Sequence, residues 1–443
     1  MEIRPANRLK KALGVSFGIA ILIGGTIGVG ILRNPGIIAG MLDNYWLIIL
    51  CWILGGVYVL IGVGSYAELA TMLPKAGGSY NYVKRAFGNY AGFLTGWFDY
   101  ITNCIAPAFF CIVISEYLVI LFPNLKDQTT VIAVAFLIGF TMLHATGVKE
   151  GSVVQQVTSV FKVVLFVIFI LACYLYSGIK IEPIKTTAPV VRAGIAIAFF
   201  KSLQLVLGTY DGWTAGSYFA EEDENPGKNI PKSLYTGAII LIIIFVLTNM
   251  AFFYVLPVST LAHSPLAASD VATVVFGKYG ATAVTAIALF SLISILNAYM
   301  MIPSRILFGL SRDGFFISKA TTVNKGGTPI VALLFSSVFS LALIMVGSFE
   351  ILFSLATFFS IVVWGLAYVS LIKLRISEPN LHRPYRAWGY PFTSILMVLL
   401  SLALLLGFAY SDRKSLLTIA LVTLFSYPIF LMIKPKLKGK SND

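Results

Sequence analysis

Residues 21–35 read ILIGGTIGVGILRNP, an apolar segment that is broken by four glycines, namely Gly24, Gly25, Gly28 and Gly30. A glycine in a helix interior costs about 1 kcal/mol relative to alanine and loosens the backbone hydrogen-bond ladder. A continuous membrane helix has no use for so many glycines. The segment therefore predicts a membrane helix that is interrupted near its middle.

An interruption at membrane depth has a consequence for binding. Unpaired N–H and C=O groups are costly in hydrocarbon, so irregular backbone persists there only where it lines a cavity or meets a ligand. The half-helix that begins near Gly28 presents free N–H groups to a carboxylate, and the half that ends near Gly25 presents free carbonyls to an ammonium. A zwitterion such as an amino acid would satisfy both ends. The alternative is that the glycines form a packing face for a neighbouring helix.

A second apolar run, residues 195–222, is interrupted in the same way by Gly208, Gly212 and Gly216. Two interrupted helices in corresponding halves of a membrane chain are a sequence sign of a transporter binding site. The pair favours a binding site over a packing face.

The composition excludes a soluble globular protein, because the 443 residues are 58% hydrophobic and only 12% charged. We expect an all-α polytopic membrane protein with a single transmembrane domain over residues 1–443 and no soluble domain. Apolar runs of about 20 residues predict twelve spans. They lie near residues 13–40, 45–72, 88–122, 129–148, 152–178, 192–221, 233–257, 279–311, 329–347, 351–374, 391–410 and 414–434.

Charge placement predicts the topology. The net charge of +13 arises because Lys and Arg concentrate in alternate connections and in both tails, which places both termini in the cytoplasm and excludes a nucleic-acid partner. The first apolar run lacks a small-residue cleavage site, so we expect no cleavable signal peptide and a location in the cell membrane. The four cysteines fall inside spans, and no His, Cys, Asp or Glu spacing predicts a metal site. No phosphate loop or nucleophile motif is present, so we expect no cofactor and no enzyme activity.

Polar residues inside the spans are the next candidates. Lys162 lies near the middle of its span, on one face with Gln155 and Ser159, where it must pair, bind carbonyls or lose its proton. Asp99 and Asn103 form a polar stripe in the third span. The acidic residues 221–224 follow the second interrupted helix, where negative charge opposes the helix dipole, which suggests pairing with basic inner loops. The roles of Glu116 and Lys201, nearer the outer ends of their spans, stay open.

Three stretches resemble the amino acid–polyamine–organocation family of transporters. They are GGTIGVGILRNPG at 24–36, GTYDGWTAGSYFAEEDENPGKNIPKSL at 208–234 and LNAYMMIPSRILFGLSRDGFFISKATTVNKGGTP at 296–329. Within that family they look most like bacterial relatives of the L-type amino acid transporters. The resemblance implies a leucine-transporter-like fold of two inverted five-helix repeats, about 13–178 and 192–374, with peripheral helices at about 391–434. It also implies alternating access around the two broken helices.

The resemblance assigns roles to residues. It implies that Gly28, Val29 and Gly30 hold the substrate carboxylate through backbone N–H groups. The amine would be bound by carbonyls around Ile23, Gly24, Ile27, Leu207, Gly208 and Tyr210. Lys162 stands where sodium-coupled relatives place an ion, which implies sodium independence. The remaining candidates are Asp211, Trp213 and Asn297 for the substrate, Lys162, Tyr210 and Trp213 for coupling and gating, and Asp99, Asn103 and Ser294 for a side-chain pocket.

Two departures from the family pattern matter. Gly208 stands near the position of a bulky aromatic gate in some relatives, so occlusion would pass to Tyr210 or Trp213. Asp211 beside the second break either binds a cationic side chain or caps a half-helix, and capping is favoured.

The sequence thus predicts a sodium-independent secondary transporter that takes up or exchanges neutral L-amino acids. The alternative with the same fold is a cationic amino acid or polyamine transporter that uses Asp99, Glu116 or Asp211. A receptor that binds an amino acid without moving it is a third possibility. Protons are a possible coupling partner through Lys162, whereas the particular amino acid, a partner subunit and the oligomeric state are not predicted.

Overall fold

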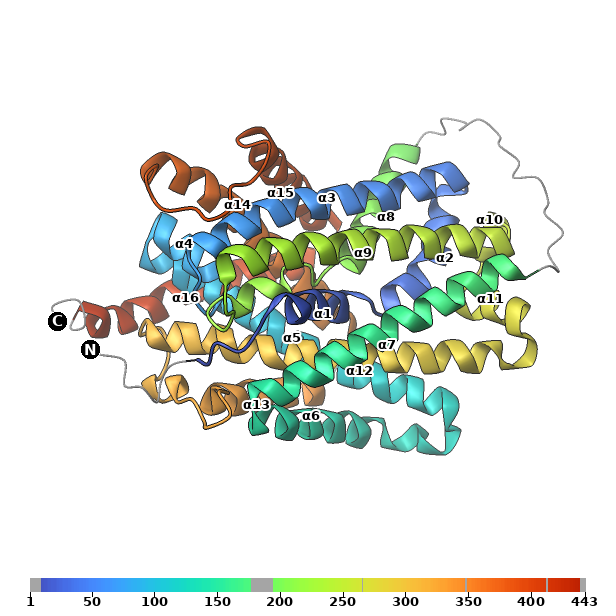
Figure 1. Ribbon diagram of the computed structural model, residues 1–443, viewed down its shortest axis with the longest axis horizontal. Coiled ribbons are helices and arrows are strands. Elements are labelled where there is room, and N and C mark those ends of the chain that lie inside the picture. The colour runs from blue at the N-terminus through green and yellow to red at the C-terminus, as the bar shows by residue number, and fades with distance from the viewer. Residues whose placement is uncertain (1–8, 177–193, 265, 347–348, 412, 439–443) are drawn as a thin grey trace.

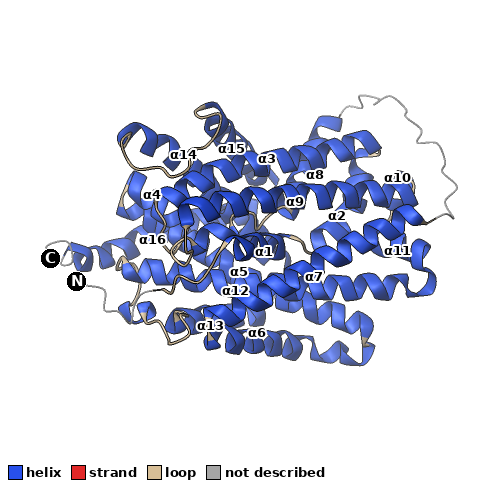
Figure 2. Ribbon diagram, in the orientation of Figure 1, coloured by secondary structure: helices blue, strands red, loops and turns tan. Residues whose placement is uncertain are grey.

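The computed structural model describes residues 9–176, 194–264, 266–346, 349–411 and 413–438. Within these ranges it is built from helices joined by loops (Figure 2). The adjoining ends of the predicted spans 152–178 and 192–221 lie partly outside the described residues.

The first half of the chain forms seven α-helices. They are α1 (Val15–Thr26), α2 (Val29–Leu42), α3 (Tyr45–Met72), α4 (Ser79–Phe87), α5 (Asn89–Leu121), α6 (Thr129–Thr146) and α7 (Val148–Leu175). A 3-10 helix, η2 (Pro123–Gln128), precedes α6.

The second half begins with α8. Its helices are α8 (Ile195–Thr209), α9 (Pro226–Val255), α10 (Val258–Leu261), α11 (Ala267–Phe276), α12 (Gly280–Arg312), α13 (Ile330–Val346), α14 (Phe349–Ser377), α15 (Phe392–Ser411) and α16 (Arg413–Lys438). Short 3-10 helices are η3 (Ala215–Phe219), η4 (Gly277–Tyr279) and η5 (Ser318–Thr321).

Fewer of the described helices than the twelve predicted spans are long enough to cross a membrane. Among the described residues, nine helices are long and apolar enough to cross a membrane, or ten when α1 and α2 count as one bent span. The helices α8, with 15 residues, and α13, with 17, are apolar but shorter. The all-helical membrane class is confirmed, whereas the count of twelve and the inverted repeat stay predictions.

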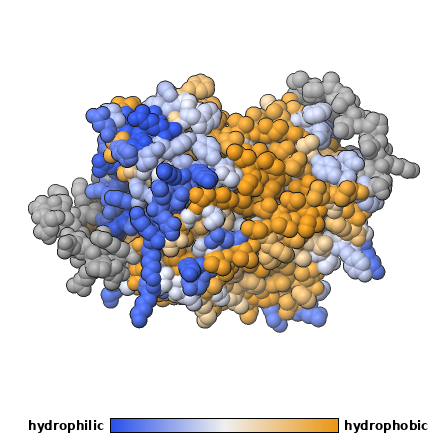
Figure 3. Space-filling model, in the orientation of Figure 1, coloured by the Kyte–Doolittle hydropathy of each residue, from blue (hydrophilic) through white to orange (hydrophobic). Residues whose placement is uncertain are grey.

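The helices run side by side along the long axis, and α1 lies among α7, α9 and α12 (Figure 1). The pairs α3 with α9 and α5 with α12 make the most extensive contacts. A broad apolar surface covers the middle of the molecule, and hydrophilic residues gather at the end that carries α4 and α16 (Figure 3). We call this the terminal end, because the described chain also starts there (Figure 1). The exposed valines along α7, such as Val153, Val157 and Val160, belong to the apolar surface, which suits contact with lipid.

Candidate functional site

Both predicted interruptions are present. The chain bends by 46° between α1 and α2, where Ile27 and Gly28 are extended rather than helical. The helix α8 ends at Thr209, and turns lead through Gly212, with φ of +104°, into η3. The two breaks therefore leave helix ends inside the molecule, as the glycine pattern indicates.

The two breaks touch each other at a pair of glycines. A Cβ added at Gly212 would lie 2.7 Å from the Gly25 carbonyl oxygen and 2.8 Å from the Thr26 hydroxyl. The positive φ of Gly212 also disfavours any residue with a side chain. Only glycine fits this contact, and its sequence signal was the glycine in the middle of the second interrupted run.

Lys162 of α7 caps the broken end of α1. Its Nζ donates hydrogen bonds to the carbonyl oxygens of Gly24, at 3.0 Å, and Ile27, at 2.7 Å. The side chain is fully buried. A cation at the carbonyl end of a half-helix satisfies unpaired acceptors and complements the negative end of its dipole. The structure therefore fills two of the carbonyls assigned to the substrate amine with a side chain of the protein.

A third carbonyl of that set is also engaged. The Ile23 oxygen accepts the N–H of Ile27 at the end of α1. Each carbonyl has two lone pairs, so further bonds are possible, but a substrate ammonium would have to share these oxygens with Lys162 and with the helix.

Asn297 and Ser294 of α12 face α7. Asn297 Nδ2 donates to Gln155 Oε1 at 2.7 Å and to the Gly151 carbonyl at 3.2 Å. The Thr158 hydroxyl donates to the Ser294 hydroxyl at 3.1 Å. These bonds hold α12 against α7. Asn297 and Ser294 therefore position the two helices, in addition to the predicted contacts with substrate.

The same polar face of α7 continues to α1. Gln155 Nε2 and the Ser159 hydroxyl donate to the Ala20 carbonyl, at 3.2 and 2.7 Å. A Cβ added at Gly24 would overlap Gln155, which explains that glycine as a close packing position. Gly24 is therefore a close packing position, as the alternative interpretation of the glycines predicts, and the helix is interrupted as well.

The start of α2 is more open. No side chain caps it at Gly28, and Val29 and Gly30 are half-buried. Gly208 at the end of α8 is exposed, with open space where a Cβ would stand. Free N–H groups at a helix start favour an anion, so the predicted carboxylate position has suitable chemistry.

The predicted gates Tyr210 and Trp213 are buried in aromatic packing. The ring of Trp213 lies 5.0 Å from that of Tyr66 and 5.7 Å from that of Trp364. The ring of Tyr210 lies 4.8 Å from that of Phe245. Leu207 is also buried. In this conformation these side chains hold the second break against the bundle.

A small cavity of about 20 Å³ lies beside the second break, between α5, η3, α12 and α14. Asp99, Asn103 and Asp211 all line it, which brings together three candidates from distant parts of the sequence. The Asp211 carboxylate accepts the N–H of its neighbour Gly212 at 2.7 Å, a bond within the turn and not the predicted helix cap, since the cap residue of α8 is Tyr210 and that of η3 is Thr214, without a side-chain cap. Sequence reasoning missed Tyr218, whose hydroxyl donates to Asp99 at 2.7 Å, and Tyr299 in the cavity wall. Glu116 and Lys201 lie on exposed surface away from it.

The terminal end of the site is closed by ion pairs, in which the acidic residues after the second break meet arginines of α12 and not, as predicted, basic residues of the inner loops. Arg305 and Glu222 form a bidentate pair at 2.9 and 3.1 Å, with both side chains buried. Arg312 pairs with Glu221 at 2.7 Å. The Leu13 and Glu222 backbones are also hydrogen-bonded, so the segment before α1 is tied to the segment after the second break.

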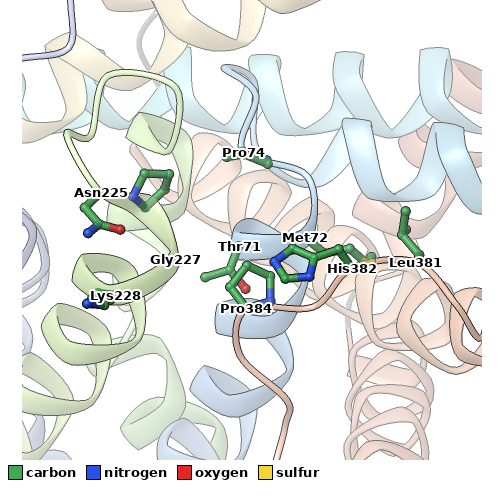
Figure 4. Close-up of a pocket in the computed structure, with 10 residues that line it drawn as sticks. Thr71, Met72, Pro74, Asn225, Gly227, Lys228, Leu381, His382 and Pro384 are labelled. Atoms are coloured by element: carbon green, nitrogen blue, oxygen red, sulfur yellow. The ribbon is translucent and has the colours of Figure 1, made fainter.

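A larger groove of about 600 Å³ lies elsewhere, at the terminal end between the end of α3, the start of α9 and the link from α14 to α15 (Figure 4). Thr71, Lys228 and His382 are among its lining residues. None of the predicted substrate residues lines it.

The described helices and apolar surface define a multi-pass membrane protein. The chain belongs to the amino acid permease family, whose pattern matches residues 13–433. It is 29% identical over 423 residues to b(0,+)-type amino acid transporter 1 of Mus musculus, across 90% of this chain and 82% of that protein. It is 26% identical over 440 residues to the serine/threonine exchanger SteT of Bacillus subtilis, across 97% of this chain and 98% of that protein.

A third relative is Asc-type amino acid transporter 1 of Mus musculus, at 27% identity over 393 residues, 85% of this chain and 73% of that protein. The resemblance to the amino acid–polyamine–organocation family is thereby confirmed. The family and these relatives make the chain an amino acid transporter rather than an enzyme.

Proposed function

We propose that this protein exchanges neutral L-amino acids across the cell membrane, without sodium, by alternating access around the α1–α2 and α8–η3 breaks. The observation that carries the proposal is the pair of hydrogen bonds from Lys162 Nζ to the carbonyls at the end of α1. This side chain occupies the carbonyls that a bound metal cation would otherwise coordinate.

The substrate's α-carboxylate would bind the N–H groups at the start of α2, from Gly28 to Gly30. Its α-ammonium would bind carbonyls at the end of α8, around Leu207 and Gly208, and share those of α1 with Lys162. The geometry supports this assignment because the two breaks are in contact, so one small zwitterion can reach both.

Alternating access would proceed from the conformation described here. The ion pairs of Arg305 and Arg312 close the terminal end, whereas Val29, Gly30 and Gly208 at the breaks are partly open. We place the terminal end and both chain termini in the cytoplasm, on the excess of Lys and Arg in the connections there. Opening to the cytoplasm would then require the segment before α1 to separate from Glu222.

Exchange, rather than net uptake, is supported by the name of the Bacillus subtilis relative, which aligns over nearly the full length of both chains. A lysine that keeps its bonds to α1 throughout the cycle agrees with exchange, because no ion then has to cross with each substrate.

The test is uptake of a radiolabelled amino acid panel into proteoliposomes, loaded or unloaded with unlabelled amino acid, in sodium or choline buffer and with or without a proton gradient. We expect uptake only into preloaded vesicles and equal rates in both buffers. Uptake into empty vesicles driven by an inward proton gradient would replace exchange with proton symport. A requirement for sodium would contradict the role given to Lys162.

A further inference from the structure

The groove at the terminal end has basic residues in its wall and no acidic ones. Its lining comes from the end of α3, the start of α9 and the α14–α15 link, residues 378–391 (Figure 4). Among the described residues that line it, Lys228 and His382 are basic and none is Asp or Glu. At about 600 Å³ the groove falls within the size range of small-ligand pockets, so it has room for an anionic group of several atoms.

Charged residues next to the groove reinforce its preference for an anion. Lys232 follows Lys228 by one turn of α9 and is exposed, as is Arg386 of the α14–α15 link. The carboxylates of the adjoining segments, Glu224 and Glu378, lie outside the lining, and Glu378 is paired with an arginine of α4 at 2.9 Å. The groove therefore has a positive rim that no carboxylate in its lining neutralises.

Aromatic side chains place the groove near a membrane surface. The hydroxyls of Tyr235 in α9 and Tyr385 in the α14–α15 link are hydrogen-bonded at 2.8 Å. Tyr235 lies two turns beyond Lys228, which is about 10 Å along the helix. Trp388 of the link is 53% exposed. Tyr and Trp side chains collect at the level of lipid headgroups, so the groove opens at that level.

An exposed apolar face of α9 continues from the groove along the helix. Ile239 and Ile243 are 47% and 51% exposed. Their spacing from Lys232 and from each other, by seven and four positions, puts them on the helix face that carries Lys228 and Lys232. Ile239 is about 16 Å along the helix from Lys228. A molecule with an anionic head and an apolar chain can therefore contact both parts of this face.

We propose that this groove binds the headgroup of an anionic phospholipid, with the phosphate at Lys228 and His382 and an acyl chain along the exposed isoleucines of α9. Basic pockets between helices at the cytoplasmic side of a membrane suit such headgroups. The first turn of α9 adds a donor, because Gly227 lines the groove and no side chain caps the helix there. A zwitterionic headgroup would bring a positive group as well, for which the lining offers no carboxylate. The proposal does not depend on which amino acid is transported.

The experiment uses the purified full-length protein in a neutral detergent, with the thermal midpoint of unfolding as the readout. Phosphatidylglycerol, phosphatidylcholine and inorganic phosphate are titrated separately, and the rise in the midpoint gives an apparent affinity for each. The variants are Lys228→Gln and His382→Gln, which remove the basic groups, and Lys228→Arg, which keeps the charge. Lys149→Gln is the matched control, because Lys149 is an exposed lysine in the first turn of another helix, α7.

We expect phosphatidylglycerol to raise the midpoint of the wild-type protein by several degrees, because the lipid would join α3, α9 and the α14–α15 link. Phosphatidylcholine and inorganic phosphate should leave the midpoint nearly unchanged. Lys228→Gln should weaken the apparent affinity for phosphatidylglycerol about fivefold, the effect typical of one basic residue at an anionic lipid surface, and His382→Gln should weaken it less. Lys228→Arg and Lys149→Gln should keep the wild-type affinity.

Four results would overturn the lipid site. The wild-type midpoint could fail to respond to phosphatidylglycerol, or phosphatidylcholine could raise it equally, which would remove the charge preference. Equal stabilisation by inorganic phosphate would mean a site for a free anion that gains nothing from the acyl chain. An equal loss of affinity in Lys149→Gln and Lys228→Gln would mean that the lipid is attracted by the basic surface as a whole and not by the groove.

Discussion

The two helix breaks differ in the side chain that is hydrogen-bonded to them. At the α1–α2 break the exposed carbonyls of Gly24 and Ile27 are bonded to a buried lysine from another helix. At the α8–η3 break the polar side chain is a carboxylate, Asp211, bonded to its neighbour Gly212. The first break is thus tied by a cation to α7, whereas the second is shaped by its own local turn.

This difference separates two tasks. The Lys162 side chain at the first break holds the end of α1 in place, beside the hydrogen-bonded network of Gln155, Ser159 and Asn297. The second break lies beside the small cavity that Asp99 and Asp211 line. The comparison predicts that loss of the Lys162 contact at the first break lowers transport of every substrate most strongly, and that changes at the second break act through packing.

The largest effect is expected from Lys162→Ala. The substitution leaves two buried carbonyls without their donor, which at about 1–3 kcal/mol each corresponds to roughly a hundredfold loss of flux for all amino acids. Counterflow of a neutral amino acid measures it, and Lys201→Ala, an exposed lysine of α8, is the control. Monodisperse protein with wild-type flux would remove Lys162 from the mechanism.

The next effect is expected from Gly212→Ala. Its Cβ would lie within 3 Å of the Gly25 backbone oxygen, and the positive φ adds about 1–2 kcal/mol of strain. We expect flux to fall about tenfold, with a drop of several degrees in the thermal midpoint, because neither backbone can move away cheaply. Gly139→Ala, where an added Cβ meets open space, is the control. Unchanged flux and midpoint would mean that the two breaks separate easily.

Much of this comparison was predictable from the residues. Glycines in an apolar run are costly, so the pattern at 21–35 and 195–222 located both interruptions. An uncompensated lysine in an apolar span had to pair with an anion, bind carbonyls or lose its proton, and the structure shows the carbonyl contacts. The helical spacing of Gln155, Ser159 and Lys162 likewise placed them on one face, which the structure directs at α1.

The partners across the bundle could not be predicted in the same way. Periodicity shows which residues share a face but not which helix that face meets, so Asn297 was assigned to the substrate although it also bonds α7. The contact of Gly212 with Gly25 and the bond from Tyr218 to Asp99 join segments that are distant in sequence. Their geometry depends on how helices pack, and a single sequence does not contain it.

A smaller effect is expected from Gly28→Ala at the first break. The added Cβ would approach the Ile295 side-chain end to 2.5 Å, and a flexible side-chain terminus can move where a backbone oxygen cannot. We expect the affinity for all amino acids to fall about threefold, which is less than the tenfold change that about 1.4 kcal/mol of binding free energy would cause. The thermal midpoint should stay nearly unchanged. Binding calorimetry checks the affinity. A loss of affinity larger than the tenfold loss of flux expected for Gly212→Ala would contradict this ranking. It would show that a single methyl group at Gly28 blocks access to the N–H groups there, so that the first break has less free space than the second.

The smallest effect is expected where α2 and α8, one half of each broken helix, meet. Asn34 Nδ2 of α2 donates to the Thr209 hydroxyl of α8 at 2.7 Å and retains a longer bond, 3.4 Å, to the Leu205 carbonyl. Thr209→Val removes the first acceptor and keeps the shape, which should cost about 1 kcal/mol and change the exchange rate twofold to fivefold. Thr273→Val on the exposed face of α11 serves as the control, and the exchange rate at saturating substrate is the measurement.

If α2 and α8 move together, the bond between Asn34 and Thr209 stays intact throughout the cycle, so Thr209→Val should lower stability without changing the exchange rate. A changed rate would instead indicate that the two halves part during transport, which is the behaviour expected if the second break adapts to substrate while the first stays fixed by Lys162.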